Sequence, residues 1–181
     1  MKLMIASDIH GSEKYCKMLV SHFKEENADR LLLLGDILYH GPRNDLPECY
    51  SPKDVIALLN ELSDKILCVR GNCDAEVDSM VLSFPLSADY AYVFVDGVSI
   101  FASHGHIFNE EKLPPLKNGD ILLNGHTHVP KCTRHNGYIY MNCGSVSIPK
   151  EDSPHSYMTL QDGVFRWKDL VSGEEYMNAE A

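Results

Sequence analysis

Asp, Asn and His side chains occur in five short motifs that are spread along the chain. The motifs are Asp8-Ile9-His10, Gly35-Asp36, Gly71-Asn72, Ser103-His104 and Gly125-His126-Thr127-His128. They offer carboxylate oxygens, an amide oxygen and imidazole nitrogens, the mixed donors that first-row divalent metals accept. For any single motif the alternative is an ordinary polar turn. Taken together, the motifs make metal chemistry the leading hypothesis.

Seven residues form the candidate metal-binding set. They are Asp8, His10, Asp36, Asn72, His104, His126 and His128. Seven donors are enough for two cations that share one bridging carboxylate. Because the set mixes nitrogen with oxygen and needs no thiolate, it favours Mn, Fe, Zn, Co or Ni over an all-oxygen calcium site. The alternative is a set of unrelated turn residues.

In the first half of the chain, short apolar runs precede these motifs. Residues 2–6, 30–34 and 65–69 are typical of buried strands. Helical periodicity over residues 12–26, with Ser12 as the N-cap, and over residues 52–63 predicts two intervening helices. This alternation favours parallel strands whose C-terminal ends carry the functional loops.

The second half changes character and is expected to be largely antiparallel. Asp96-Gly97 lies between two β-rich runs and predicts a hairpin. The predicted strands cover residues 90–95, 98–103, 120–123, 138–141, 157–160 and 164–167. We expect one α/β domain over residues 1–172. Residues 173–181 lack a periodic pattern, so we expect a frayed tail there.

Composition limits the classes of partner. The chain has 181 residues with 16 basic and 26 acidic side chains, a formal net charge of −10. This charge disfavours long nucleic acid, although bound cations would still admit a small anionic substrate. No apolar run is long enough for a membrane span and no export signal is evident, so we expect a cytoplasmic protein. The six cysteines lack CxxC spacing and are expected to be reduced.

The order of the motifs resembles the calcineurin-like metallophosphoesterase superfamily. The resemblance rests on DxH, GD, GN with Asp two residues later, a lone His and GHTH, which span residues 8–128. The longer segments ASDIHGS, LGDILYHGPRN, VRGNCD, SHGH, GHTHVP and NCGSVSIP look like the small bacterial YfcE-type phosphodiesterases, as far as Lys150. The resemblance implies a two-sheet α/β sandwich flanked by helices, with mixed parallel and antiparallel strands.

The resemblance also implies roles for these residues. One metal would be held by Asp8, His10, Asp36 and His128, and the other by Asp36, Asn72, His104 and His126. We ourselves expect Asp36, Asn72, His104 and Cys73 to take part in catalysis. Hydroxide held at this two-metal centre would attack a small phosphate diester. Mn²⁺ is the expected metal, with Zn²⁺, Fe, Ni²⁺ and Co²⁺ left open.

Cys73 departs from the pattern, because many members of the superfamily carry His at this position. A thiol with an ordinary pKa of about 8.5 is a poor proton donor to an alkoxide. We therefore expect substrates whose leaving groups need no proton. The alternatives for Cys73 are a small buried filler beside the metals and a redox or regulatory role. Asp74 in the same loop is expected to orient a neighbour by hydrogen bonding.

Arg43 and Asn44 are the candidates for substrate binding. They lie in the loop after Asp36, where an arginine fork suits a phosphate oxygen, and the alternative is an ordinary surface loop. His106 is expected to support the ligands without being one. The remaining histidines singled out, His22, His135 and His155, are expected to be solvated or structural.

Three rival functions remain at this point. The nearest is a phosphomonoesterase, because monoesters and diesters differ by one charge. Another is a non-catalytic protein-interaction scaffold, since this fold also serves that purpose, although no ligand position is missing here. A nuclease is disfavoured by the net charge and by the lack of a basic stretch with interleaved aromatic residues. Exposed strand edges would allow a homo-oligomer.

Overall fold

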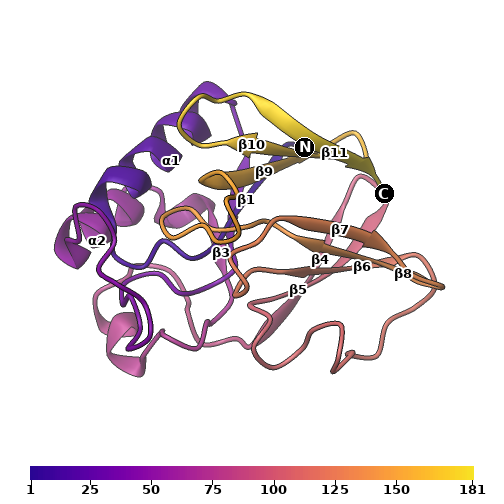
Figure 1. The fold of residues 1–181 in the computed structure, drawn as a ribbon, viewed down its shortest axis with the longest axis horizontal. Coiled ribbons are helices and arrows are strands. Elements are labelled where there is room, and N and C mark those ends of the chain that lie inside the picture. Colours follow the sequence, from indigo (N-terminus) through magenta and orange to yellow (C-terminus); the bar gives the residue numbers. More distant parts are fainter.

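Two mixed β-sheets pack face to face in the computed structural model, which describes residues 1–181 (Figure 1). The first sheet has the strand order β11-β10-β9-β1-β2-β3. Its strands are β1 (Leu3–Ala6), β2 (Arg30–Leu33), β3 (Ile66–Cys68), β9 (Ser156–Gln161), β10 (Val164–Asp169) and β11 (Glu175–Glu180). β1, β2 and β3 are parallel, as predicted, whereas β9, β10 and β11 are antiparallel to their neighbours.

The second sheet has the order β4-β5-β6-β8-β7. Its strands are β4 (Tyr90–Val95), β5 (Val98–Ser103), β6 (Asp120–Asn124), β7 (Lys131–Arg134) and β8 (Tyr138–Asn142). β4 and β5 form the predicted hairpin around Asp96-Gly97. The expectation of a largely antiparallel second half is wrong for the centre of this sheet, because β5, β6 and β8 are parallel. Loops and β7 connect them instead of helices, so no helical periodicity marks this pairing.

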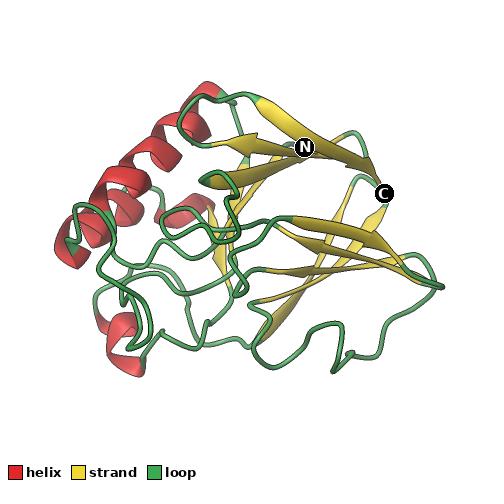
Figure 2. Ribbon diagram, viewed as in Figure 1, coloured by secondary structure: helices red, strands yellow, loops and turns green.

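Both α-helices cover one face of the first sheet (Figure 2). α1 (Glu13–Glu25) is capped by Ser12, whose Oγ accepts from the backbone N–H of Tyr15, and α2 (Pro52–Asn60) carries Pro52 in its first turn. Short 3₁₀ turns occupy η1 (Ser63–Lys65) and η2 (Glu76–Met80). The sandwich is therefore flanked by helices on one side only.

Neither helix has the length and apolar content needed to cross a lipid bilayer.

Burial on both faces explains the apolar runs of the central strands. In β1, Leu3 and Ile5 point into the core between the sheets, and Met4 and Ala6 point toward the helices. A strand covered on both sides reads as continuously hydrophobic. The outer face of the second sheet has no helix; a small cluster around Phe101 is buried there, while Tyr92 and Phe94 stay exposed beside it.

The frayed tail predicted for residues 173–181 is wrong. β11 pairs antiparallel with β10 as an edge strand, so the sheet extends past residue 172. An edge strand packs little apolar surface and is held mainly by backbone hydrogen bonds. β7 escaped prediction for the same reason, because its sequence Lys-Cys-Thr-Arg has no apolar alternation.

Candidate metal centre

The predicted ligand residues lie together at the strand ends shared by the two sheets. In one group, Asp8 Oδ1 is 3.4 Å from His10 Nε2 and 3.2 Å from His128 Nε2. The two imidazole nitrogens are themselves 3.3 Å apart. All three side chains are buried. Three donors from two distant parts of the chain thus converge on one point.

The second group forms around His104. Its Nε2 atom is 3.1 Å from Asn72 Oδ1 and 3.2 Å from His126 Nδ1. Asp36 lies between the two groups, because its Oδ2 atom is 3.7 Å from His10 Nε2 and 3.3 Å from His104 Nε2. A single carboxylate oxygen therefore faces both sets of donors.

The backbone at this centre adopts unusual conformations. Five of the candidate ligands have φ between 49° and 66°, in the left-handed region: Asp8, His10, Asp36, His126 and His128. Non-glycine residues seldom occupy this region, and such strain concentrates at functional sites. Holding these side chains toward the centre therefore lowers the stability of the folded state.

Close backbone approach accounts for the glycine that precedes Asn72. A Cβ atom on Gly71 would lie 2.1 Å from Asp36 Oδ1 and 2.4 Å from the Asp36 backbone nitrogen. Only a residue without a side chain lets these two loops meet. Gly71 thus allows the close packing that positions Asp36, the candidate bridging ligand, and Asn72 offers its amide oxygen as a further donor.

Each carboxylate is held by one oxygen and leaves the other free. Asp8 Oδ2 accepts from the backbone N–H of His126 at 3.0 Å, and Asp36 Oδ1 accepts from that of Cys73 at 2.8 Å. Asp8 Oδ1 is buried without a hydrogen-bond partner, while Asp36 Oδ2 faces the imidazoles. A buried carboxylate oxygen without a partner is costly unless a cation meets it. The donor set therefore fits bound divalent metal.

Three of the four imidazoles are fixed by backbone carbonyls. The Nδ1–H groups of His10, His104 and His128 donate to the carbonyls of Tyr39, Leu34 and Ile148 at 2.7, 2.7 and 2.6 Å. This contact orients each ring so that Nε2 faces the centre, as in proteins that bind metal through histidine. His126 differs, because its Nδ1 atom faces His104.

Burial and neighbouring charges shift the pKa values of three side chains at this centre in different directions. Burial alone raises the pKa of Asp8, but the imidazoles of His10 and His128 beside its Oδ1 atom hold it well below its ordinary value. Burial lowers the pKa of His104, yet contact with Asp36 and the charge of Asp8 raise it to about 9. Burial and the charge of His104 lower the pKa of His126 to about 4.

Two sets of neighbours hold the ligand loops. Asp74 accepts from the backbone N–H groups of Asp36, Ile37 and Gly71 at 2.7–2.8 Å, which confirms the orienting contact expected of it. Ser145 and Ser147 donate their hydroxyls to the carbonyl of Asp8 at 3.1 and 3.0 Å. Neither serine was predicted, since only the NCGSVSIP segment hinted at this region.

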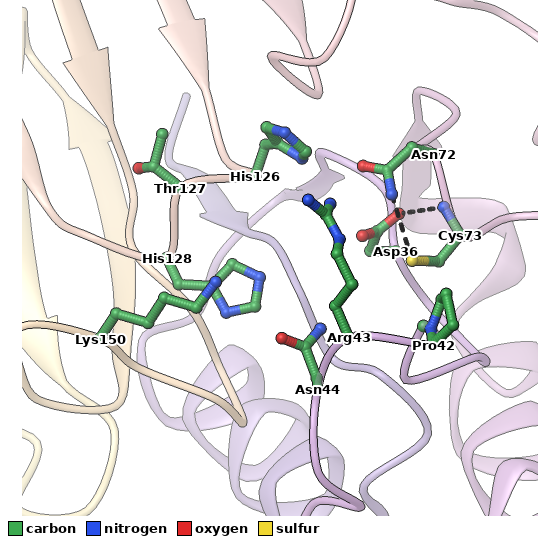
Figure 3. Close-up of a pocket in the computed structure, with 11 residues that line it drawn as sticks. Asp36, Pro42, Arg43, Asn44, Asn72, Cys73, His126, Thr127, His128 and Lys150 are labelled. Atoms are coloured by element: carbon green, nitrogen blue, oxygen red, sulfur yellow. Dashed lines mark hydrogen bonds between the residues drawn. The ribbon is translucent and has the colours of Figure 1, made fainter.

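A cavity of about 400 Å³ opens above the centre (Figure 3). Arg43 and Asn44, the candidates for substrate binding, line it, although Asn44 Nδ2 also donates to the carbonyl of His40 at 2.8 Å. Thr127 and Lys150 line it too and were not predicted. The complete lining is Asp36, Gly41, Pro42, Arg43, Asn44, Asn72, Cys73, His126, Thr127, His128 and Lys150.

Cys73 is half-buried against the candidate ligands. Asn72 Nδ2 donates to its Sγ atom at 3.3 Å (Figure 3). Burial and the charge of Asp36 raise the pKa of the thiol to about 12. The ordinary thiol pKa expected from the sequence is therefore too low. A thiol of this pKa is an even weaker proton donor than predicted.

The remaining histidines do not enter the cavity. His106 lies beside His104 with a ring separation of 5.4 Å, and its buried Nδ1 has no hydrogen-bond partner. His22, His135 and His155 contact the Leu170 carbonyl, the Glu110 carboxylate and the Val146 carbonyl, respectively. These three contacts are structural or lie at the surface.

Comparisons with known proteins show the family and the fold of this chain. The model of the calcineurin-like phosphoesterase superfamily domain matches residues 1–162. Phosphodiesterase YfcE of Escherichia coli K12 is 47% identical over 164 residues, covering 91% of this chain and 89% of that protein. A solved structure of YfcE, described as a phosphoesterase from E. coli, superposes with a TM-score of 0.96 at 43% identity, covering 99% of each chain. Zinc-bound Vps29 of Entamoeba histolytica, with a TM-score of 0.65, 18% identity and 99% of each chain covered, shares the fold.

Proposed function

This chain belongs to the calcineurin-like phosphoesterase superfamily, and we propose that it is a metal-dependent phosphodiesterase acting on small phosphate diesters at a centre of two divalent cations. The observation that carries the proposal is the position of Asp36 Oδ2 between two groups of donors. The 47% sequence identity with phosphodiesterase YfcE supports phosphodiester hydrolysis as the reaction class. The net charge of −10 supports a small substrate over long nucleic acid.

Asp36 serves as the bridging ligand in this proposal. Asp8, His10 and His128 complete one metal site, and Asn72, His104 and His126 complete the other. The mixture of nitrogen and oxygen donors supports Mn²⁺ and its first-row neighbours. When bound, such cations lower the pKa of a shared water and neutralise the phosphoryl oxygens.

Arg43 is the proposed phosphate-binding residue. Its guanidinium makes no hydrogen bond or ion pair within the chain and lines the cavity, where Figure 3 shows it rising from the loop toward the middle. A guanidinium offers a planar fork of donors that matches two phosphoryl oxygens. Asn44 lies beside it and closes the loop onto His40.

Cys73 shapes the choice of leaving group. It occupies the rim beside Asn72, where its protonated thiol cannot give a proton readily to an alkoxide. The enzyme therefore favours diesters whose leaving group is stable as an anion.

A paired assay tests the proposal. The protein is stripped of metal, reloaded with Mn²⁺ and supplied with bis(p-nitrophenyl) phosphate or p-nitrophenyl phosphate. We expect metal-dependent hydrolysis with a preference for the diester. A preference for the monoester would support the phosphomonoesterase alternative. Calorimetric metal binding without hydrolysis of either ester would support the scaffold.

A further inference from the structure

Lys150 places a positive charge at the rim of the cavity, and its amine has no partner. The side chain is exposed and lines the cavity, yet it makes no hydrogen bond or ion pair within the chain. Figure 3 shows it on the His128 side of the pocket, with Arg43 closer to the middle. Apart from Asp36, the lining contains no acidic residue. In a chain of net charge −10, this rim is locally cationic.

The backbone fixes where Lys150 stands relative to the centre. Its N–H donates to the carbonyl of His128 at 3.3 Å, and its own carbonyl accepts from Ser153 N and Oγ at 3.1 and 2.6 Å. Ile148, two residues earlier, accepts from His128 Nδ1 at 2.6 Å. The segment thus wraps around one candidate ligand and holds the lysine beside it, while the amine stays free.

The rest of the rim is polar. No Phe, Tyr or Trp lines the cavity, and Pro42 and Cys73 are its least polar side chains. A nucleobase would therefore lack the stacking surface on which binding of such groups depends. The acids that follow Lys150, Glu151 and Asp152, are exposed and lie outside the lining. Lys150 would repel an ester whose alcohol portion carries a positive charge and would attract one whose alcohol portion carries a negative charge.

We infer that Lys150 determines substrate specificity by binding a second anionic group, so that the preferred substrates are phosphodiesters of small polar alcohols carrying, for example, a carboxylate. The inference rests on the proposed phosphodiesterase function. Arg43 meets the phosphoryl oxygens, which leaves Lys150 to recognise charge elsewhere on the ester. The second charge of a phosphomonoester lies on the phosphoryl group itself and gives Lys150 no separate target.

Two synthetic diesters of equal size differ only in the charge of the alcohol portion. Both release p-nitrophenol; one carries a 2-carboxyethyl group and the other a 2-carbamoylethyl group. With the Mn²⁺-loaded enzyme we expect kcat/KM to favour the carboxylate about fivefold, chiefly through KM, the size of effect that a partly exposed charge pair produces. The preference should shrink as salt is added. A purely structural role for Lys150 would give neither result.

Four variants assign the preference to one side chain. Lys150→Met should bring the ratio of kcat/KM for the two diesters to about one, Lys150→Arg should retain the preference and Lys150→Glu should reverse it. Lys17→Met is the matched control, because Lys17 is an exposed lysine of α1 outside this cavity. An unchanged ratio in Lys150→Met would overturn the inference.

Binding gives a readout that does not depend on turnover. Phosphonate analogues of both diesters, with a methylene in place of the scissile oxygen, are titrated by calorimetry. The wild type should bind the carboxylate analogue about fivefold more tightly, and Lys150→Met should bind both alike. Hydrolysis of the amide diester without any carboxylate preference overturns this inference alone. Hydrolysis of neither diester would overturn the proposed phosphodiesterase function as well.

Discussion

The candidate metal centre and the rim of the cavity above it differ in how firmly the fold holds their side chains. At the centre, Asp8 is buried, lies in a left-handed conformation and is anchored through both Oδ2 and its carbonyl. At the rim, the side chains of Arg43 and Lys150 are exposed and bonded to nothing in the chain. A preorganised centre suits chemistry that depends on exact placement of charge. Unbonded side chains at the rim suit contacts that form only when substrate binds.

This contrast separates two kinds of substitution. Changes at the centre should alter metal content, folding stability and turnover together, because each side chain there is held by several others. Changes at the rim should alter substrate affinity or the preference for leaving groups, and should leave the fold intact. The following substitutions test that separation.

Asp36→Asn should have the largest effect. The amide keeps the shape of the side chain but removes the charge that faces both donor groups. We expect kcat/KM to fall by about 10³-fold or more and metal content, measured by elemental analysis, to drop from two ions to one. Asp45→Asn, in the exposed part of the neighbouring loop, is the control. Full metal content with near-normal turnover would argue against a bridging role.

Gly35→Ala tests whether the close contact between the two loops that hold Asp36 stabilises the fold. Gly35 has φ of 95°, and a Cβ atom there would lie 2.4 Å from the Gly71 nitrogen. We expect a loss of about 3 kcal/mol in the free energy of unfolding, measured by urea denaturation. Gly97→Ala is the matched control, because Gly97 has φ of 83° with open space around it and should lose about 1 kcal/mol. Equal losses would show that close approach at Gly35 adds nothing.

Cys73→His should have a smaller effect that is confined to one class of substrate. The imidazole would give the rim a proton donor, so hydrolysis of alkyl esters with poor leaving groups should speed up about tenfold. Rates on p-nitrophenyl esters should change less. The exposed Cys49→His variant controls for a new histidine elsewhere. A slower or unchanged rate on the alkyl esters, with metal content intact, would contradict the role given to Cys73.

Arg43→Met should have the smallest effect. Loss of the guanidinium should raise KM for the diester about fivefold with little change in kcat or in metal content. Steady-state kinetics on the reloaded enzyme measures both constants. Lys53→Met removes an exposed positive charge from α2 and is the control. A large fall in kcat at constant KM would instead tie Arg43 to the transition state.

The elements visible in the sequence are those whose pattern reflects burial. The central strands β1 and β2 are covered on both faces, so their apolar runs predicted them, and the Asp96-Gly97 turn predicted the β4–β5 hairpin. The edge strands β7 and β11 were missed because backbone bonds hold them without much apolar packing. The parallel centre of the second sheet was missed because no helices connect its strands.

The candidate site shows a similar division. Asp, Asn and His at strand ends are uncommon enough in combination to predict a candidate ligand set, and the structure brings all seven side chains together. Lys150, Thr127 and the two serines that hold Asp8 are ordinary surface or turn residue types. The positions of Lys150 and the two serines depend on how the segment after β8 folds back across the strand ends, which no local pattern encodes.

Anomalous scattering from crystals grown with Mn²⁺ shows directly whether Asp36 bridges two cations. We expect two manganese peaks in each chain, one on either side of Asp36 and close to its Oδ2 atom. One group of donors should surround each peak: His10 with Asp8 and His128, and His104 with Asn72 and His126. A single peak, or a pair that Asp36 does not bridge, would contradict this expectation.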